Sequence, residues 1–121
     1  MGLKLSEIKE ILKADVIVGE NKMDVIIQAG AGSDLMSDLL RGSKNDVVVL
    51  SGLNTLQIIR TSVVAEVAAV VLVRGKQPEP EMIDLARFHD LPLLSTPFTM
   101  FTACGRLFRQ GLRGVERKKS E

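Results

Sequence analysis

The segment 80–97 constrains the fold more than any other part of the sequence. It predicts a helix over residues 81–89, a very tight turn, a short buried strand at 91–94 and then a polar loop. This succession, with very few connecting residues, is typical of one helix-to-strand unit of a parallel sheet. Open α/β sheets bind ligands beside the carboxyl ends of their strands, so the loop after residue 94 is a place to expect a ligand.

The same alternation of helix and strand continues through the rest of the chain. Apolar runs at 47–50 and 68–73 predict strands, and the second run is apolar on both faces, which indicates a central parallel strand. β-branched residues predict further strands at 16–18 and 25–27. Apolar spacing predicts helices near 6–12, 33–42, 55–67, 81–89 and 98–110. We therefore expect one α/β domain of three layers, with a mostly parallel sheet of about five strands and helices on both faces.

The helix patterns also predict which side chains face the core. In the helix after residue 55, the expected buried face is formed by Leu56, Ile59, Val63 and Val67. In the last helix the expected core residues are Phe101, Leu107 and Phe108, with Cys104 between them as a small core residue. We expect the core to span about residues 3–112 and the charged tail, 113–121, to be frayed.

Composition excludes several classes of protein. The 121 residues contain 16 Lys and Arg against 15 Asp and Glu, and this balance gives a net charge of +1 and no basic face for nucleic acid. One cysteine and one histidine cannot form a disulfide framework or a zinc site, so we expect neither metal nor cofactor and a reducing, cytoplasmic location. The sequence has no signal-peptide pattern, and no apolar run approaches the roughly 20 residues of a membrane helix.

Three polar segments follow predicted strands, and they should meet at one edge of a parallel sheet. The first contains a Gly-Ala-Gly-Ser sequence that opens a helix, where backbone N–H groups bind anions well. The second is 51–55 and the third is 95–99. Together they supply the candidate ligand-binding residues, which are Gly30, Gly32, Ser33, Asp34, Asp38, Ser51, Asn54, Thr55, Ser95 and Thr96.

Each of these segments also has an ordinary structural explanation. The glycine segment lacks the Gly-Lys-Ser/Thr of a P-loop, and glycines are common turn formers. Asp34 and Asp38 share a helix face and can hold a cation or a ligand hydroxyl, but acidic residues near a helix start also suit the helix dipole. Asn54 is suited to cap a helix. His89 sits at a helix end without a partner nucleophile, so no catalytic residue is assigned.

Two separated motifs give the chain a resemblance to a known family. A helix ending in Leu91-Pro92-Leu93-Leu94 and followed by Ser-Thr-Pro resembles the end of the amino-terminal domain of HPr kinase/phosphorylase, and still more the DRTGG domain family. In short members of that family a glycine-bearing strand end runs into a Ser-Asp-Leu-Leu-Ser-Asp helix, and here Gly30-Ala31-Gly32 leads into Ser33-Asp34-Leu35-Met36-Ser37-Asp38. The resemblance covers roughly residues 3–112. The segment 24–30, which aligns with the one that names the family, keeps the aspartate and final glycine but lacks the arginine, threonine and first glycine.

The resemblance implies a regulatory or ligand-sensing domain without catalytic activity, and we expect any ligand to be small, anionic or nucleotide-like and to bind at the strand ends. It implies no kinase activity, because it reaches only the amino-terminal domain of the kinase. Two other functions remain open: a protein-interaction subunit acting as a homodimer, and an enzyme using Asp34 and Asp38. The family's domains tend to pair, and the last helix has more large apolar residues than one buried stripe needs, so we expect a homodimer with its seam on that helix.

Overall fold

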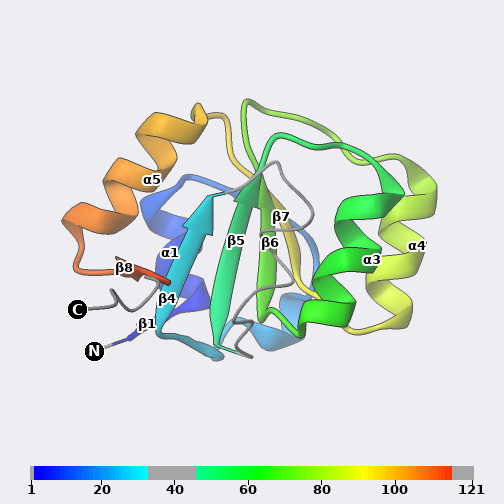
Figure 1. The fold of residues 1–121 in the computed structure, drawn as a ribbon, viewed down its shortest axis with the longest axis horizontal. Coiled ribbons are helices and arrows are strands. Elements are labelled where there is room, and N and C mark those ends of the chain that lie inside the picture. Colours follow the sequence, from blue (N-terminus) through cyan, green and yellow to red (C-terminus); the bar gives the residue numbers. More distant parts are fainter. Residues whose placement is uncertain (1, 33–45, 116–121) are drawn as a thin grey trace, which may run out of the picture.

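The computed structural model describes residues 2–32 and 46–115, and its centre is a six-stranded sheet (Figure 1). Five strands run parallel, and only the edge strand β2 is antiparallel, to β7. Across the sheet the strands are β2 (Asp15–Val18), β7 (Leu93–Ser95), β6 (Ala69–Leu72), β5 (Val47–Ser51), β4 (Ala29–Gly32) and β8 (Arg113–Gly114).

The two most apolar strands lie in the interior of the sheet, as the sequence predicts. Every residue of β5 and β6 is buried, and β6 pairs in parallel with both β5 and β7. A parallel strand covered on both faces must be apolar on both faces, because neither face meets water. The apolar runs at 47–50 and 68–73 therefore indicated both the state and the position of these strands correctly.

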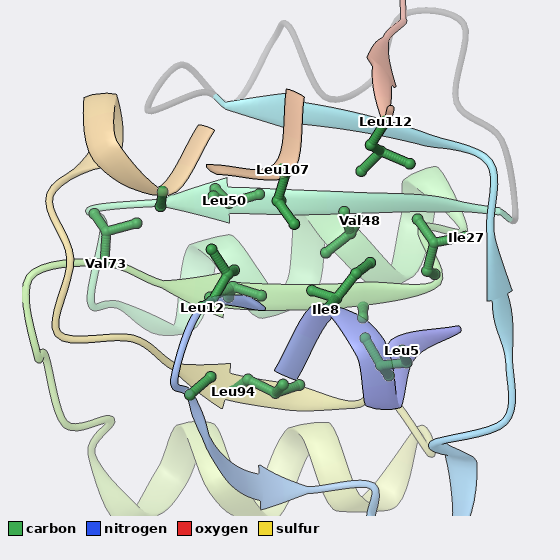
Figure 2. Close-up of a cluster of buried hydrophobic side chains, with 14 residues drawn as sticks. Leu5, Ile8, Leu12, Ile27, Val48, Leu50, Val73, Leu94, Leu107 and Leu112 are labelled. Carbon is green, nitrogen blue, oxygen red and sulfur yellow. The ribbon is translucent and has the colours of Figure 1, made fainter. Parts of the chain in front are cut away.

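Helices cover both faces of the sheet, which gives the expected three layers (Figure 1). On one face α1 (Leu5–Ile11) and α5 (Met100–Arg109) pack over a core to which β5, β6 and β7 contribute. Figure 2 shows Ile8 of α1, and Leu12 directly after the helix, in the same cluster as Leu94 and Leu107. The other face is covered by α3 (Leu56–Ala65) and α4 (Pro80–Phe88). The predicted fold class, a mostly parallel α/β sheet between helices, is confirmed, with six strands in the sheet where the sequence indicated about five.

Short pairings at the ends of the chain were not all expected. The predicted strand at 25–27 shortens to β3 (Ile26–Ile27), which pairs with β1 (Leu3–Lys4) in a separate two-stranded sheet. A short 3-10 helix, η1 (Glu20–Lys22), lies between β2 and β3. Arg113 and Gly114, expected in a frayed tail, form β8 against Ala29 and Gly30, because an edge strand offers unpaired backbone groups.

The glycine segment corrects a prediction, because it lies inside the sheet and does not form a loop. Residues 29–32 are strand β4, paired on one side with β5 and on the other with β8. A Cβ on Gly32 would stand 3.0 Å from both Cys104 Sγ and Met100 Sδ, and one on Gly30 would stand 3.2 Å from Leu112 Cδ2. These glycines therefore allow α5 and the residues after it to approach the sheet closely.

Two predicted buried faces are partly wrong. In α3 the buried side chains are Ile58, Ile59, Thr61, Ser62 and Ala65, while Leu56 and Val63 are only half-buried, as is Val67 just after the helix. In α5 Ala103 and Leu107 are buried, but Phe101 and Phe108 are 89% and 58% exposed. One of these exposed rings contacts an arginine: the Arg113 guanidinium lies over the Phe108 ring, 4.2 Å from its centre.

Candidate functional site

The polar segments that follow the parallel strands leave the sheet at one edge. The register pairs Ser51 with Leu72, and Leu72 with Ser95, so the ends of β5, β6 and β7 lie side by side. The segments 51–55, 73–79 and 95–99 start from these ends, at the top of the sheet in Figure 1. The structure thus meets the geometric condition for a shared site at this edge, where parallel sheets place ligands.

Most of the predicted side chains at this edge are occupied by neighbouring backbone. Ser95 Oγ donates a hydrogen bond of 2.7 Å to the Lys76 carbonyl, and the Asn54 side-chain amide donates one of 2.9 Å to the Gln77 carbonyl. The Leu53 N–H donates to Ser51 Oγ at 3.1 Å. Ser51 and Ser95 are fully buried. Ser95 and Asn54 therefore hold the connection between β6 and α4, and Ser51 holds the segment that follows β5.

Thr96 has a similar structural role. Its side chain is completely buried, and Oγ1 donates a 2.6 Å hydrogen bond to the Leu12 carbonyl at the end of α1. The same oxygen accepts a hydrogen bond from the Phe98 N–H at 3.3 Å. Thr96 thus joins the carboxyl edge of the sheet to the helix layer beneath it.

Asn54 and Thr55 differ from the other predicted residues. The N-cap of α3 is Thr55, not Asn54, and the Thr55 side chain makes no capping hydrogen bond and is exposed. The Asn54 amide nitrogen is held by Gln77, whereas its Oδ1 atom is buried with no hydrogen-bond partner. A buried oxygen without a donor is uncommon in folded proteins, so Asn54 is the one predicted site residue at this edge with an unsatisfied buried acceptor among the described residues.

The remaining predicted residues divide between the sheet and the part outside the described residues. Gly30 and Gly32 belong to β4, and Gly32 is its last residue, at the same edge as Ser51. Ser33, Asp34 and Asp38, and with them the predicted helix at 33–42, lie outside the described residues. Among residues 2–32 and 46–115 no group of three or more His, Cys, Asp or Glu side chains is arranged to hold a metal ion.

Sequence reasoning missed two basic residues at this edge. Arg74 and Lys76 directly follow the central strand β6, and Arg74 takes a left-handed backbone conformation with φ of 60°. Neither forms an ion pair in the part of the chain that the structure describes. The signal is present in the sequence, because Arg74-Gly75-Lys76 directly follows the apolar run at 68–73. Cations after a central parallel strand are well placed to attract an anionic ligand.

Cys104 should react slowly in the folded protein. It is half-buried, its Sγ lies 3.7 Å from Met100 Sδ, and burial raises the pKa of the thiol above its ordinary value of 9.0. The thiolate is the reactive form, so alkylation by iodoacetamide should be much slower in the folded than in the unfolded protein at neutral pH. Because the folded state holds this proton more tightly, the stabilising contribution of the neutral thiol should be lost as pH rises through the folded pKa.

Mass spectrometry across a pH series measures the rate at which Cys104 is alkylated. The substitution Cys104→Ala should lower the free energy of unfolding by roughly 1 kcal/mol and leave ligand binding unchanged. Equal alkylation rates for folded and unfolded protein at neutral pH would overturn a structural role for this thiol.

Comparison with known proteins identifies the kind of domain that this edge belongs to. Residues 7–109 match the DRTGG domain family, and the chain belongs to that family. The fold is similar to the crystal structure of the CBS and DRTGG domains of the regulatory region of a Clostridium perfringens pyrophosphatase, determined in complex with its activator diadenosine tetraphosphate. The two have 19% sequence identity and a TM-score of 0.72 over 86% of this chain. The chain spans 45% of the length of that structure.

Both comparisons cover most of the chain. The family match extends over nearly all described elements, and the similar structure is a regulatory region. The enzymatic alternative is based on Asp34 and Asp38, which lie outside the described residues. No curated protein matches the sequence. In the described part of the chain, no helix combines the length and the apolar character needed to cross a membrane.

Proposed function

We propose that this domain is a cytoplasmic regulatory module that senses a small anionic or nucleotide-like ligand at the carboxyl edge of its sheet. The observation that carries the proposal is the buried, unpartnered Asn54 Oδ1 at the edge where three strand-end segments meet. Amino and hydroxyl groups of a nucleotide supply the donor that this oxygen lacks. The similar pyrophosphatase region has a dinucleotide activator, which supports a nucleotide-like ligand.

The charges at the same edge favour an anion. Arg74 and Lys76 have no acidic partner within 2–32 and 46–115, and the Thr55 hydroxyl stands free at the N-terminus of α3. The N-terminal end of this ten-residue helix carries partial positive charge, which favours phosphate. Ser51, Ser95 and Thr96 act indirectly in this proposal, because they hold the segments that carry these groups.

A thermal-shift screen against nucleotides, diadenosine tetraphosphate and acyl phosphates tests the proposal. A ligand that binds only the folded state raises its apparent stability with concentration. We expect Lys76→Met and Asn54→Ala each to weaken the binding of a hit by about tenfold, the equivalent of about 1.4 kcal/mol. Lys9→Met is the matched control, since Lys9 is half-buried on α1 and pairs only with Glu10 at 3.4 Å. A hit whose affinity is the same in all three variants would contradict the proposed site.

A homodimer formed through α5 is the second candidate. Phe101 and Phe108 are seven residues apart, so they share one face of α5, and both are exposed. Leu107, the other large apolar residue in this part of α5, is buried in the core and cannot contribute to the seam. The seam in this proposal is therefore the Phe101 and Phe108 face, and a closed two-fold pair would bury it.

Sedimentation at micromolar protein concentration tests the dimer. We expect a dimer mass that falls to the monomer mass in Phe101→Glu, because a charge in an apolar seam is costly. Phe88→Glu is the matched control, since Phe88 is 81% exposed on α4, on the other face of the sheet. A monomer mass for the unmodified protein would rule this candidate out.

A further inference from the structure

A cavity of about 350 Å³ lies at the opposite edge of the sheet, where β6 and β7 begin. Its walls come from η1 and the residues after it, from the C-terminal end of α3, and from the connection between α4 and β7. No residue that the sequence predicted for the ligand site lines it. The volume is within the range of small-molecule sites, about 300–1,000 Å³. One wall is apolar and consists of Val25, Val63, Val67, Ala68, Leu91 and Pro92.

Ser62 gives this cavity a polar group that the protein itself leaves unsatisfied. The side chain lies on the buried face of α3 and lines the cavity, and its Oγ atom is buried with no hydrogen-bond partner. A buried hydroxyl without a partner destabilises the fold unless something else supplies the missing hydrogen bond. A bound ligand with a donor or an acceptor at this point would supply it.

Charged side chains of both signs line the same cavity without pairing with each other. Lys22 is half-buried, and Glu66 and Asp90 extend from the residues that follow α3 and α4. In the described ranges, the one ion pair joins two other residues, Lys9 and Glu10. The C-terminal ends of α3 and α4 add partial negative charge near the two carboxylates, which favours an ammonium group there.

We propose that this cavity binds a small zwitterion of the amino-acid type. Its ammonium group pairs with Glu66 and Asp90, its carboxylate pairs with Lys22, and its apolar side chain packs against the valine-rich wall. A simple anion would be repelled by two carboxylates and two helix C-termini. A simple cation would leave Lys22 without a partner. A polyphosphate is disfavoured for the same reason, so this site takes a different class of ligand from the carboxyl edge.

Thermal-shift and calorimetric titrations of the full chain with L-valine, L-leucine and L-methionine test the proposal. At least one of them should raise the unfolding temperature in a concentration-dependent way. Isoamylamine and isocaproate are the matched probes for leucine, since each keeps the apolar frame and only one of its two charges. Both should bind at least about tenfold more weakly than leucine. If no amino acid binds, or if isoamylamine binds as well as leucine, the proposal is wrong.

Two variants locate the binding. Lys22→Met should weaken amino-acid binding about tenfold, whereas Lys9→Met should leave it unchanged. Glu66 has φ of 59°, a left-handed conformation that glycine adopts more easily, so Glu66→Gly should stabilise the free protein while it weakens binding. Lys13→Gly is its control, because Lys13 has φ of 49° and does not line the cavity. Amino-acid binding that is unaffected by both Lys22→Met and Glu66→Gly would place the site elsewhere and overturn the assignment.

Discussion

Replacing Gly19 by alanine should lower the free energy of unfolding by about 2–5 kcal/mol, the sum of backbone strain and overpacking. Gly19 precedes η1 with φ of 103°, a conformation that residues with a side chain rarely adopt. The added Cβ would stand 2.8 Å from the Pro92 Cα and 2.9 Å from its Cβ. Since Pro92 leads directly into β7, neither side can move without disturbing the start of that strand.

Gly111→Ala separates the two causes. Gly111 has nearly the same φ, 102°, but a Cβ there would meet no atom within 4 Å. This control should cost about 1 kcal/mol from backbone strain alone. Chemical denaturation of the two variants measures the difference, which reports the contact between Gly19 and Pro92. Equal losses in both variants would mean that this contact has no energetic importance.

Replacing Thr96 by valine should lower the free energy of unfolding by about 1–3 kcal/mol. The two side chains have nearly the same shape, but valine leaves the buried Leu12 carbonyl without the 2.6 Å hydrogen bond from Thr96 Oγ1. It also removes the acceptor for the Phe98 N–H. Chemical denaturation at equilibrium measures the loss.

Thr102→Val is the control for this substitution. Thr102 is exposed on α5, and its hydroxyl contacts only the exposed Thr99 hydroxyl, at 3.3 Å. Its replacement should change stability by less than about 0.5 kcal/mol. A Thr96→Val protein of unchanged stability that no longer bound a nucleotide would show that Thr96 contacts the ligand, contrary to the structural role assigned here.

The strands that the sequence predicted best are those that are buried on both faces. In β5 and β6 every side chain is buried, so the apolar runs in the sequence reflect the burial of both faces of these strands. The segment from α4 to β7 was equally clear, because the helix, turn and strand follow each other within residues 80–95.

Strand β4 could not be predicted, because its residues have low intrinsic preference for a strand. Ala29, Gly30, Ala31 and Gly32 form one because all four pair with β5, and β8 pairs with the first two on the other side. The small size of Gly32 is required by α5, whose Cys104 and Met100 sulfur atoms occupy the space where a larger side chain would be. Neither the pairing nor this contact is visible in local sequence.

The exposure of Phe101 and Phe108 was also not predictable from helical spacing. Periodicity showed that α5 has an apolar stripe, but Ala103 and Leu107 form it, and the two larger aromatic side chains lie on the exposed side. Size and hydrophobicity therefore led to the wrong face. The same two residues are the basis of the proposed dimer seam.

At the carboxyl edge the sequence predicted which residues follow the strand ends but not their hydrogen-bond partners. Ser95 bonds to a carbonyl 19 residues away, Asn54 to one 23 residues away, and Thr96 to one 84 residues away. Such distant partners are set by the packing of whole elements. Their effect is that most of the hydroxyls expected to meet a ligand hold the fold instead, and the proposed ligand contacts shift to Asn54, Thr55, Arg74 and Lys76.

A ligand site at the carboxyl edge of the sheet is tested most directly by following backbone amide resonances during titration with a nucleotide. The protein is small enough for each amide to be observed separately, and diadenosine tetraphosphate is the first probe to use. We expect concentration-dependent shifts concentrated at residues 51–55 and 73–77 and little change at Lys22, Glu66 and Asp90 on the opposite edge. Shifts confined to that opposite edge, or no shifts with any nucleotide or acyl phosphate, would contradict it.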